Sequence, residues 1–62
     1  MFFKTLVTET DHLPVYKKNL ERIQKQGISC RTERTKIDES RTIYRIYVNS
    51  VDYRKTADAL KF

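Results

Sequence analysis

Residues 13–30 read LPVYKKNLERIQKQGISC, and this stretch decides the fold of the chain. Its first part carries apolar side chains at the spacing of one helix face, at Leu13, Tyr16, Leu20 and Ile23. The only glycine of the chain, Gly27, comes next, and then Ile28 and Cys30 begin an alternating, strand-like run. Because glycine readily adopts the left-handed conformation that ends many helices, the pattern predicts a helix over residues 14–26 between two strands.

The segments around this helix predict three strands. Residues 2–8 are rich in aromatic and β-branched side chains, which favour a strand. A second strand is predicted over residues 28–36 and a third over residues 42–48. The polar residues 36–41 between them contain no Gly or Asn, so we expect a wide hairpin loop rather than a tight two-residue turn.

A second helix follows the third strand and is predicted to continue into the C-terminus. Asn49 or Ser50 is the expected capping residue, because both side chains accept hydrogen bonds from the free N–H groups of a helix start. The apolar positions of this helix lie at i, i+4 and i+7, at Tyr53, Ala57 and Leu60. We therefore expect Tyr53 to be part of the core, like Tyr16 and Tyr44.

This order of elements predicts an α+β fold of the β-α-β-β-α type. A crossover through a helix is right-handed, and the hairpin makes the second and third strands antiparallel neighbours. The third strand then fits between the other two. The result is a three-stranded antiparallel sheet in the order 1-3-2 with two helices on one face, which is a ferredoxin-like split β-α-β unit without its final strand.

Size and composition are those of one small domain spanning residues 1–62. The chain is 39% hydrophobic and 34% charged, which fits a folded soluble protein better than a disordered one. Cys30 is the only cysteine, so an internal disulfide is excluded and we expect a small core residue. No stretch approaches the roughly 20 apolar residues of a membrane span, and the apolar start is too short for a signal peptide. We expect a cytoplasmic location.

One face of the predicted sheet is left uncovered by the helices. The covered face is expected to hold Ile28, Cys30, Tyr44, Ile46 and Val48, and the uncovered face Arg31, Glu33, Ile43, Arg45 and Tyr47. From the second group we predict four partner-binding residues: Arg31, Ile43, Arg45 and Tyr47. A partly apolar face beside open strand edges favours protein binding or self-association, although a face without a binding role is the simpler interpretation.

The basic residues support an alternative hypothesis. The net charge is +5, and an aromatic side chain such as Tyr47 beside arginines can stack on a base and hold its phosphates. The candidate nucleic-acid-binding residues are Lys17, Lys18, Arg22, Arg31, Arg34 and Arg45. An ordinary solvated surface explains the same charges, so both interpretations stay open.

No motif in the sequence predicts catalysis, a metal or a cofactor. Glu9, Asp11 and His12 lie close together, but without a second His or Cys they are a weak metal site, and Asp11 is predicted to cap the first helix instead. His12 has no evident orienting partner for acid–base work. A single glycine cannot form a glycine-rich phosphate loop. We therefore expect a protein that is not an enzyme and has no small-molecule substrate.

Four short segments carry a resemblance to a known family. These are the leading strand over residues 3–7, QGISC over 26–30, IYV over 46–48, and the helical residues 57–60. In these segments the chain resembles small bacterial signal-transducing proteins whose fold is likened to that of the PII regulators. The resemblance implies the β-α-β-β-α order and a regulatory or binding role, and it carries over no catalytic residue and no ligand site.

Taken together, the sequence predicts a small regulatory or protein-interaction module in the style of bacterial or phage proteins. We expect it to act by binding a macromolecular partner and to form a homodimer. The alternative is a nucleic-acid-binding protein, and a third possibility is a subunit of a larger assembly, with the second helix docked on a neighbour.

Overall fold

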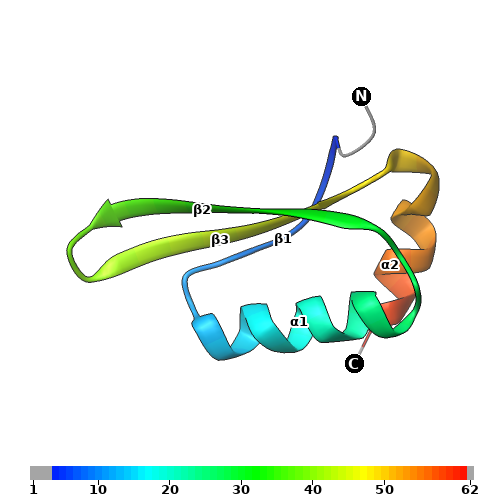
Figure 1. Ribbon diagram of the computed structural model, residues 1–62, viewed down its shortest axis with the longest axis horizontal. Coiled ribbons are helices and arrows are strands. Elements are labelled where there is room, and N and C mark those ends of the chain that lie inside the picture. The colour runs from blue at the N-terminus through cyan, green and yellow to red at the C-terminus, as the bar shows by residue number, and fades with distance from the viewer. Residues whose placement is uncertain (1–3, 62) are drawn as a thin grey trace.

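The computed structural model describes residues 4–61, which form a thin layer of sheet with helices against it (Figure 1). The elements follow in the predicted order: β1 (Thr5–Thr10), α1 (Leu13–Lys25), β2 (Cys30–Asp38), β3 (Arg41–Val48), the 3₁₀ turn η1 (Ser50–Asp52) and α2 (Tyr53–Ala59). The start of the predicted first strand, Phe2 and Phe3, lies outside the described residues.

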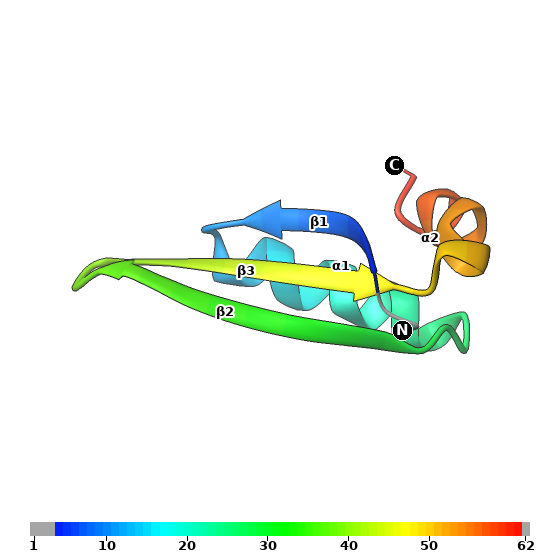
Figure 2. The same cartoon turned by 90° about the horizontal axis from the view of Figure 1, so that it is seen from above.

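The sheet has the predicted topology. β3 is the central strand and pairs antiparallel with β1 on one side and β2 on the other, which gives the order β1-β3-β2 (Figure 2). β2 and β3 form a long hairpin that extends past the N-terminal end of α1 (Figure 1). The hairpin therefore supplies most of the sheet, and β1 pairs along the inner half of β3.

Gly27 ends α1 as predicted. Its φ is +72°, in the left-handed region that side-chain-bearing residues avoid. The N–H of Ile28 donates to the carbonyl of Ile23 at 3.3 Å, and that of Gly27 to the carbonyl of Gln24 at 3.0 Å. This pair of bonds is the Schellman motif, and it carries the chain from the helix directly to the start of β2.

The start of α1 differs from the prediction. His12, rather than Asp11, holds the capping position, and it makes no side-chain cap hydrogen bond. The hydroxyl of Thr10 instead accepts a hydrogen bond from the N–H of His12 at 3.1 Å, while the carboxylate of Asp11 lies 3.6 Å from the guanidinium of Arg41. Asp11 therefore forms an ion pair with the first residue of β3 instead of capping the helix. Pro14 occupies the first helical turn as expected.

The core lies between the sheet and α1. Its fully buried members are Ile23 from α1 and Ile46 and Val48 from β3, joined by Ile28 from the segment after the helix. Partly buried side chains surround them: Val7, Tyr16, Leu20, Cys30 and Leu60. The shortest dimension of the molecule is 14 Å and runs across the three strands (Figures 1 and 2), because neighbouring strands of a sheet lie only about 4.8 Å apart.

β1 contains a bulge that changes which face its later residues occupy. Leu6 pairs with Tyr47 of β3 but Thr8 pairs with Ile46, so the register shifts between them at Val7. In a regular strand Glu9 would share the face of Val7, toward the core. Because of the extra residue, Glu9 instead lies opposite Arg45, on the face away from the helices.

The β2–β3 turn is tighter than predicted. β2 continues to Asp38 and β3 begins at Arg41, so only two residues separate the strands. The carboxylate of Asp38 accepts hydrogen bonds from the backbone N–H of Ser40 at 2.9 Å and from its hydroxyl at 3.0 Å. This side-chain bridge, with a register shift between Lys36 and Asp38, closes the turn without the positive φ values that most two-residue hairpins use.

The buried face of α2 also differs from the prediction. Tyr53 is 49% exposed, whereas Thr56 is fully buried. The hydroxyl of Thr56 donates to the carbonyl of Asp52 at 2.8 Å, which satisfies its polar group inside the protein. Asn49 is a cap as expected, since its side chain accepts a hydrogen bond from the N–H of Val51 at the start of η1.

Candidate interaction face

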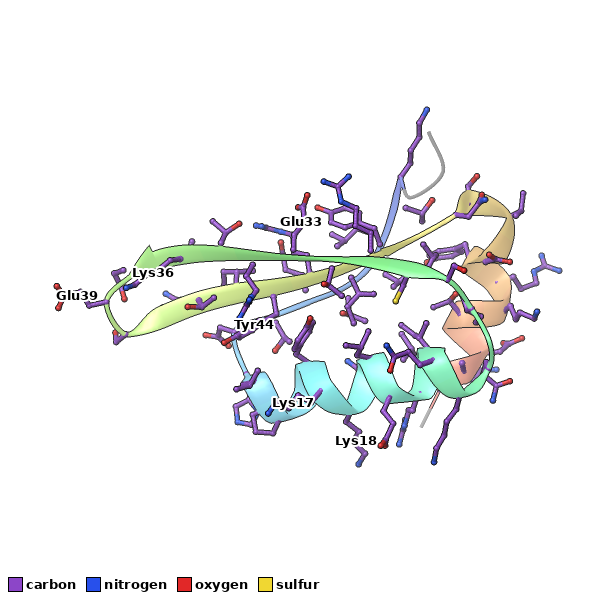
Figure 3. All side chains as sticks on the ribbon, in the orientation of Figure 1. Lys17, Lys18, Glu33, Lys36, Glu39 and Tyr44 are labelled. Carbon is purple, nitrogen blue, oxygen red and sulfur yellow. The ribbon has the colours of Figure 1, made fainter. Side chains whose placement is uncertain are left out.

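The sheet has one face without helices, which we call the open face. Among residues 4–61, α1 lies along the other side and α2 stands at the end where β3 finishes (Figure 1). Figure 3 shows the two sides, because Glu33 projects from the open face while Tyr44 lies on the side of α1. Strand pairing assigns these residues to the open face: Leu6, Glu9, Arg31, Glu33, Thr35, Ile43, Arg45 and Tyr47.

The four predicted partner-binding residues lie together on this face. Ile43, Arg45 and Tyr47 alternate along the central strand, and Arg31 lies directly opposite Tyr47 on β2. Leu6 of β1 lies opposite Tyr47 on its other side. Tyr47 is therefore the middle residue of a row that crosses all three strands.

Arg45 occupies the centre of the next row and is held by two neighbours. Its Nε donates to a carboxylate oxygen of Glu9 on β1 at 2.6 Å, and its Nη1 donates to the hydroxyl of Thr35 on β2 at 3.0 Å. The hydrogen bond to Glu9 raises the pKa of the Arg45 guanidinium above its ordinary value. Arg45 thus links the three strands, and its charge is already matched within the protein.

The remaining charges of the open face are matched as well. A guanidinium nitrogen of Arg31 lies 3.4 Å from a carboxylate oxygen of Glu33 on the same strand. Glu33 in turn lies opposite Arg45 in the strand pairing. With Glu9, the paired residues of this face include two arginines and two glutamates, so their charges balance although the whole chain carries +5.

Apolar side chains complete the face. Leu6 is 42% exposed, which is high for a leucine within a strand. Ile43 and Tyr47 are half-buried and lie on the same face. The open face therefore combines exposed apolar surface with fixed, mutually satisfied charges.

Three residues of this face were not among the predicted ones. Leu6 was missed because the strand register that places it opposite Tyr47 cannot be read from the sequence. Glu9 was missed because regular alternation places it with the core residue Val7. Thr35 carries no distinctive signal, and only the position of Arg45 gives it a role.

The six candidate nucleic-acid-binding residues do not form one surface. Arg31 and Arg45 lie on the open face and are paired with glutamates. Arg34 lies opposite Tyr44, on the other side of the sheet. The remaining three, Lys17, Lys18 and Arg22, belong to α1, and Lys18 points away from the sheet (Figure 3).

On the helix side, two tyrosines connect α1 to the sheet. The rings of Tyr16 and Tyr44 are stacked, with centroids 4.8 Å apart and planes inclined by 23°. Both tyrosines are half-buried, so they lie at the edge of the core rather than fully inside it as predicted. Cys30 is half-buried on the same side, and burial raises the pKa of its thiol above the usual range.

Residues 4–61 contain no group of three or more His, Cys, Asp and Glu side chains arranged to hold a metal ion. They enclose no pocket. Neither α1 nor α2 combines the length and the apolar character that crossing a bilayer would require.

The open face is therefore the feature of the described residues on which a functional argument can rest. Comparison with models of protein families, with curated proteins and with solved structures finds no match to this chain.

Proposed function

We propose that this protein is a small, non-enzymatic interaction module that binds a partner protein through its open face and acts as a homodimer. The composition of that face supports the proposal most directly. Leu6 offers exposed apolar surface. The two arginines of the face, Arg31 and Arg45, are each paired with a glutamate of the same face. A face that buries apolar area and is electrically balanced suits a protein partner better than a polyanion.

A regulatory role in the cytoplasm is the second part of the proposal. The resemblance to small signal-transducing proteins supports it. The chain has a single cysteine and so no internal disulfide, which is usual for proteins of a reducing compartment.

A matched pair of substitutions in an affinity capture experiment tests the open face. Leu6→Glu places a charge in the exposed apolar part of the face, and Val51→Glu makes the same change at an 82% exposed position in η1, beyond the end of β3. The protein and both variants are immobilised and exposed to native lysate, with and without nuclease. We expect specific proteins to be retained by the original protein and by Val51→Glu, and to be lost with Leu6→Glu.

Two results would contradict the proposal. One is retention that disappears after nuclease treatment, accompanied by oligonucleotide binding that weakens steeply with salt, which would favour the nucleic-acid alternative. The other is equal retention by Leu6→Glu and Val51→Glu, which would mean that the open face is not the binding surface.

A further inference from the structure

The outer edge of β2 offers a second binding surface. β2 is nine residues long, lies at the edge of the sheet, and contains neither proline nor glycine (Figure 2). None of the other described elements pairs with this edge, so its outward N–H and C=O groups are available to another strand. β1, at the opposite edge, is shorter and is interrupted near its middle by its bulge, whereas the register shift of β2 lies close to its end, between Lys36 and Asp38.

Symmetry limits how a second copy of β2 can pair with the first. Two identical strands pair antiparallel about a two-fold axis perpendicular to the sheet, and directly opposed residues then point to the same face. The axis must therefore pass midway between one residue and its own copy, which lie directly opposite each other. We name each possible register by that residue. Each choice of that residue fixes every other pair, so the possible registers can be compared by their charges.

Most registers bring like charges together. An axis at Arg31, at Glu33 or at Arg34 places that residue opposite its own copy, and both carry the same charge. An axis at Thr35 places Arg34 opposite Lys36 on both sides of the axis. Like charges directly opposed across two strands are destabilising, so these four registers are disfavoured.

An axis at Thr32 has no such conflict and provides opposite charges instead. Arg31 then lies opposite the partner's Glu33, and Glu33 opposite the partner's Arg31, on the open face. The two threonines form a cross-strand pair of a type that stabilises sheets. An axis at Lys36 or at Asp38 again places a charged residue opposite its own copy. An axis at Cys30 or at Ile37, near the two ends of β2, would leave most of the strand unpaired.

This register also continues a charge pattern that is already present in one copy. Glu9, Arg45 and Glu33 form a row across β1, β3 and β2, with alternating signs. The partner's Arg31 would extend the row by a fourth alternating charge. Within each copy Arg31 and Glu33 are already 3.4 Å apart, so the four side chains would form a square of alternating charges at the axis.

We propose that two copies of this chain join through their β2 edges, antiparallel and centred on Thr32, to form a continuous six-stranded sheet. Both open faces lie on the same side of that sheet, so together they form one larger face for a partner. This inference rests on the homodimer of the proposed function and names the surface that forms it. The contact is small, and we expect micromolar rather than tighter association.

A charge-exchange cycle tests the register. Arg31→Glu and Glu33→Arg each place like charges opposite one another twice in the dimer, whereas the double substitution restores opposite charges. Sedimentation equilibrium from about 10 μM to about 1 mM covers the dissociation constants expected for such a contact. We expect each single variant to associate roughly three- to tenfold more weakly and the double variant to recover most of the loss.

Lys25→Glu is the control for net charge, because it makes the same charge change as Arg31→Glu near the end of α1. We expect it to associate like the original protein. Circular dichroism establishes that each variant is folded before its association is measured, since Glu33→Arg also places a second arginine beside Arg45. A double variant as weak as the single ones would overturn the proposed register.

Disulfide trapping gives an independent readout. Directly opposed residues of antiparallel strands have Cα atoms about 4.5–5.5 Å apart, within the range of a disulfide. In a Cys30→Ser background we expect Thr32→Cys to form a covalent dimer on mild oxidation. Thr35→Cys in the same background is the control, because its two copies would lie about 20 Å apart along the strands. Equal trapping at both positions would overturn the proposal.

The outcomes separate this inference from the function on which it rests. A protein that stays monomeric throughout the concentration range contradicts both the homodimer and the β2 contact. A dimer that is indifferent to the charge exchange and is not trapped at Thr32 contradicts only the β2 contact.

Discussion

Arg45 and Glu9 are 36 positions apart in the sequence, and their side chains meet at 2.6 Å on the open face. The contact joins β1 to β3 at the position where the bulge in β1 has moved Glu9 away from the core. It holds an arginine that would otherwise be available to an anionic ligand. The pair therefore contributes both to the closure of the sheet and to the charge balance of the face.

A double-mutant cycle with Glu9→Gln and Arg45→Met should detect this contact. We expect a favourable coupling free energy that decreases between about 0.1 M and about 1 M salt, because exposed charges are screened over a shorter distance at the higher ionic strength. Urea unfolding followed by circular dichroism provides the measurement. Strictly additive effects of the two substitutions would contradict the pairing.

Gly27→Ala should destabilise the protein by about 1 kcal/mol, because alanine is strained at a φ of +72°. Apart from Gly27 and its two chain neighbours, residues 4–61 place no heavy atom within 4 Å of the position that the new Cβ would take, so steric conflict does not add to the loss. Gly27→Asn should cost less, since asparagine tolerates the left-handed region. Gln26→Ala, at the adjacent exposed position, is the control and should be nearly neutral in the same urea titrations.

Thr8→Val should increase the free energy of unfolding by about 1 kcal/mol, because the hydroxyl oxygen of Thr8 is buried and has no hydrogen-bond partner within residues 4–61. Valine has nearly the same shape and removes the unsatisfied group. Thr10→Val is the matched control in the same strand, and it should lower stability slightly, since the Thr10 hydroxyl accepts a hydrogen bond from His12. Thermal unfolding of both variants measures the difference, and a loss of stability in Thr8→Val would contradict the assignment.

The Asp38 carboxyl should titrate below its ordinary range. The backbone N–H of Ser40, followed by its hydroxyl, lowers the pKa of Asp38 by hydrogen bonding to the charged form. Its contribution to the turn is complete above the ordinary aspartate pKa and is lost as the pH falls through the lowered value. NMR titration of the side-chain carbon gives this pKa directly. In Ser40→Ala it should rise only part of the way back, because the backbone donor remains.

The general arrangement could be predicted because strong local signals determine it. Gly27 marks the end of a helix whose apolar face is regular, and the hairpin leaves one position for β3 between the other strands. The faces of β3 followed from simple alternation, so Arg45 and Tyr47 were placed together correctly.

The differences arise where a local contact overrides a pattern. α2 is seven residues long, too short for the spacing of Tyr53 and Ala57 to determine its buried face, and Thr56 is buried there with its hydroxyl satisfied by the backbone. The tight turn depends on the Asp38 side chain, which replaces the glycine that such turns usually contain. The bulge at Val7 has no sequence marker, and this is why Glu9 was not assigned to the open face.

The bulge also constrains how the length of β1 can change. Deleting one residue between Leu6 and Glu9 would remove the extra residue and leave Glu9 on the open face, opposite Arg45. A one-residue deletion elsewhere in β1 has no such compensation, and pairing the present sequence without the bulge would turn the carboxylate of Glu9 beneath α1, where burying an unpaired charge is very costly. The guanidinium of Arg45 would lose its partner in that unbulged pairing. A single-residue deletion in β1 should consequently be better tolerated at the bulge than elsewhere in the strand.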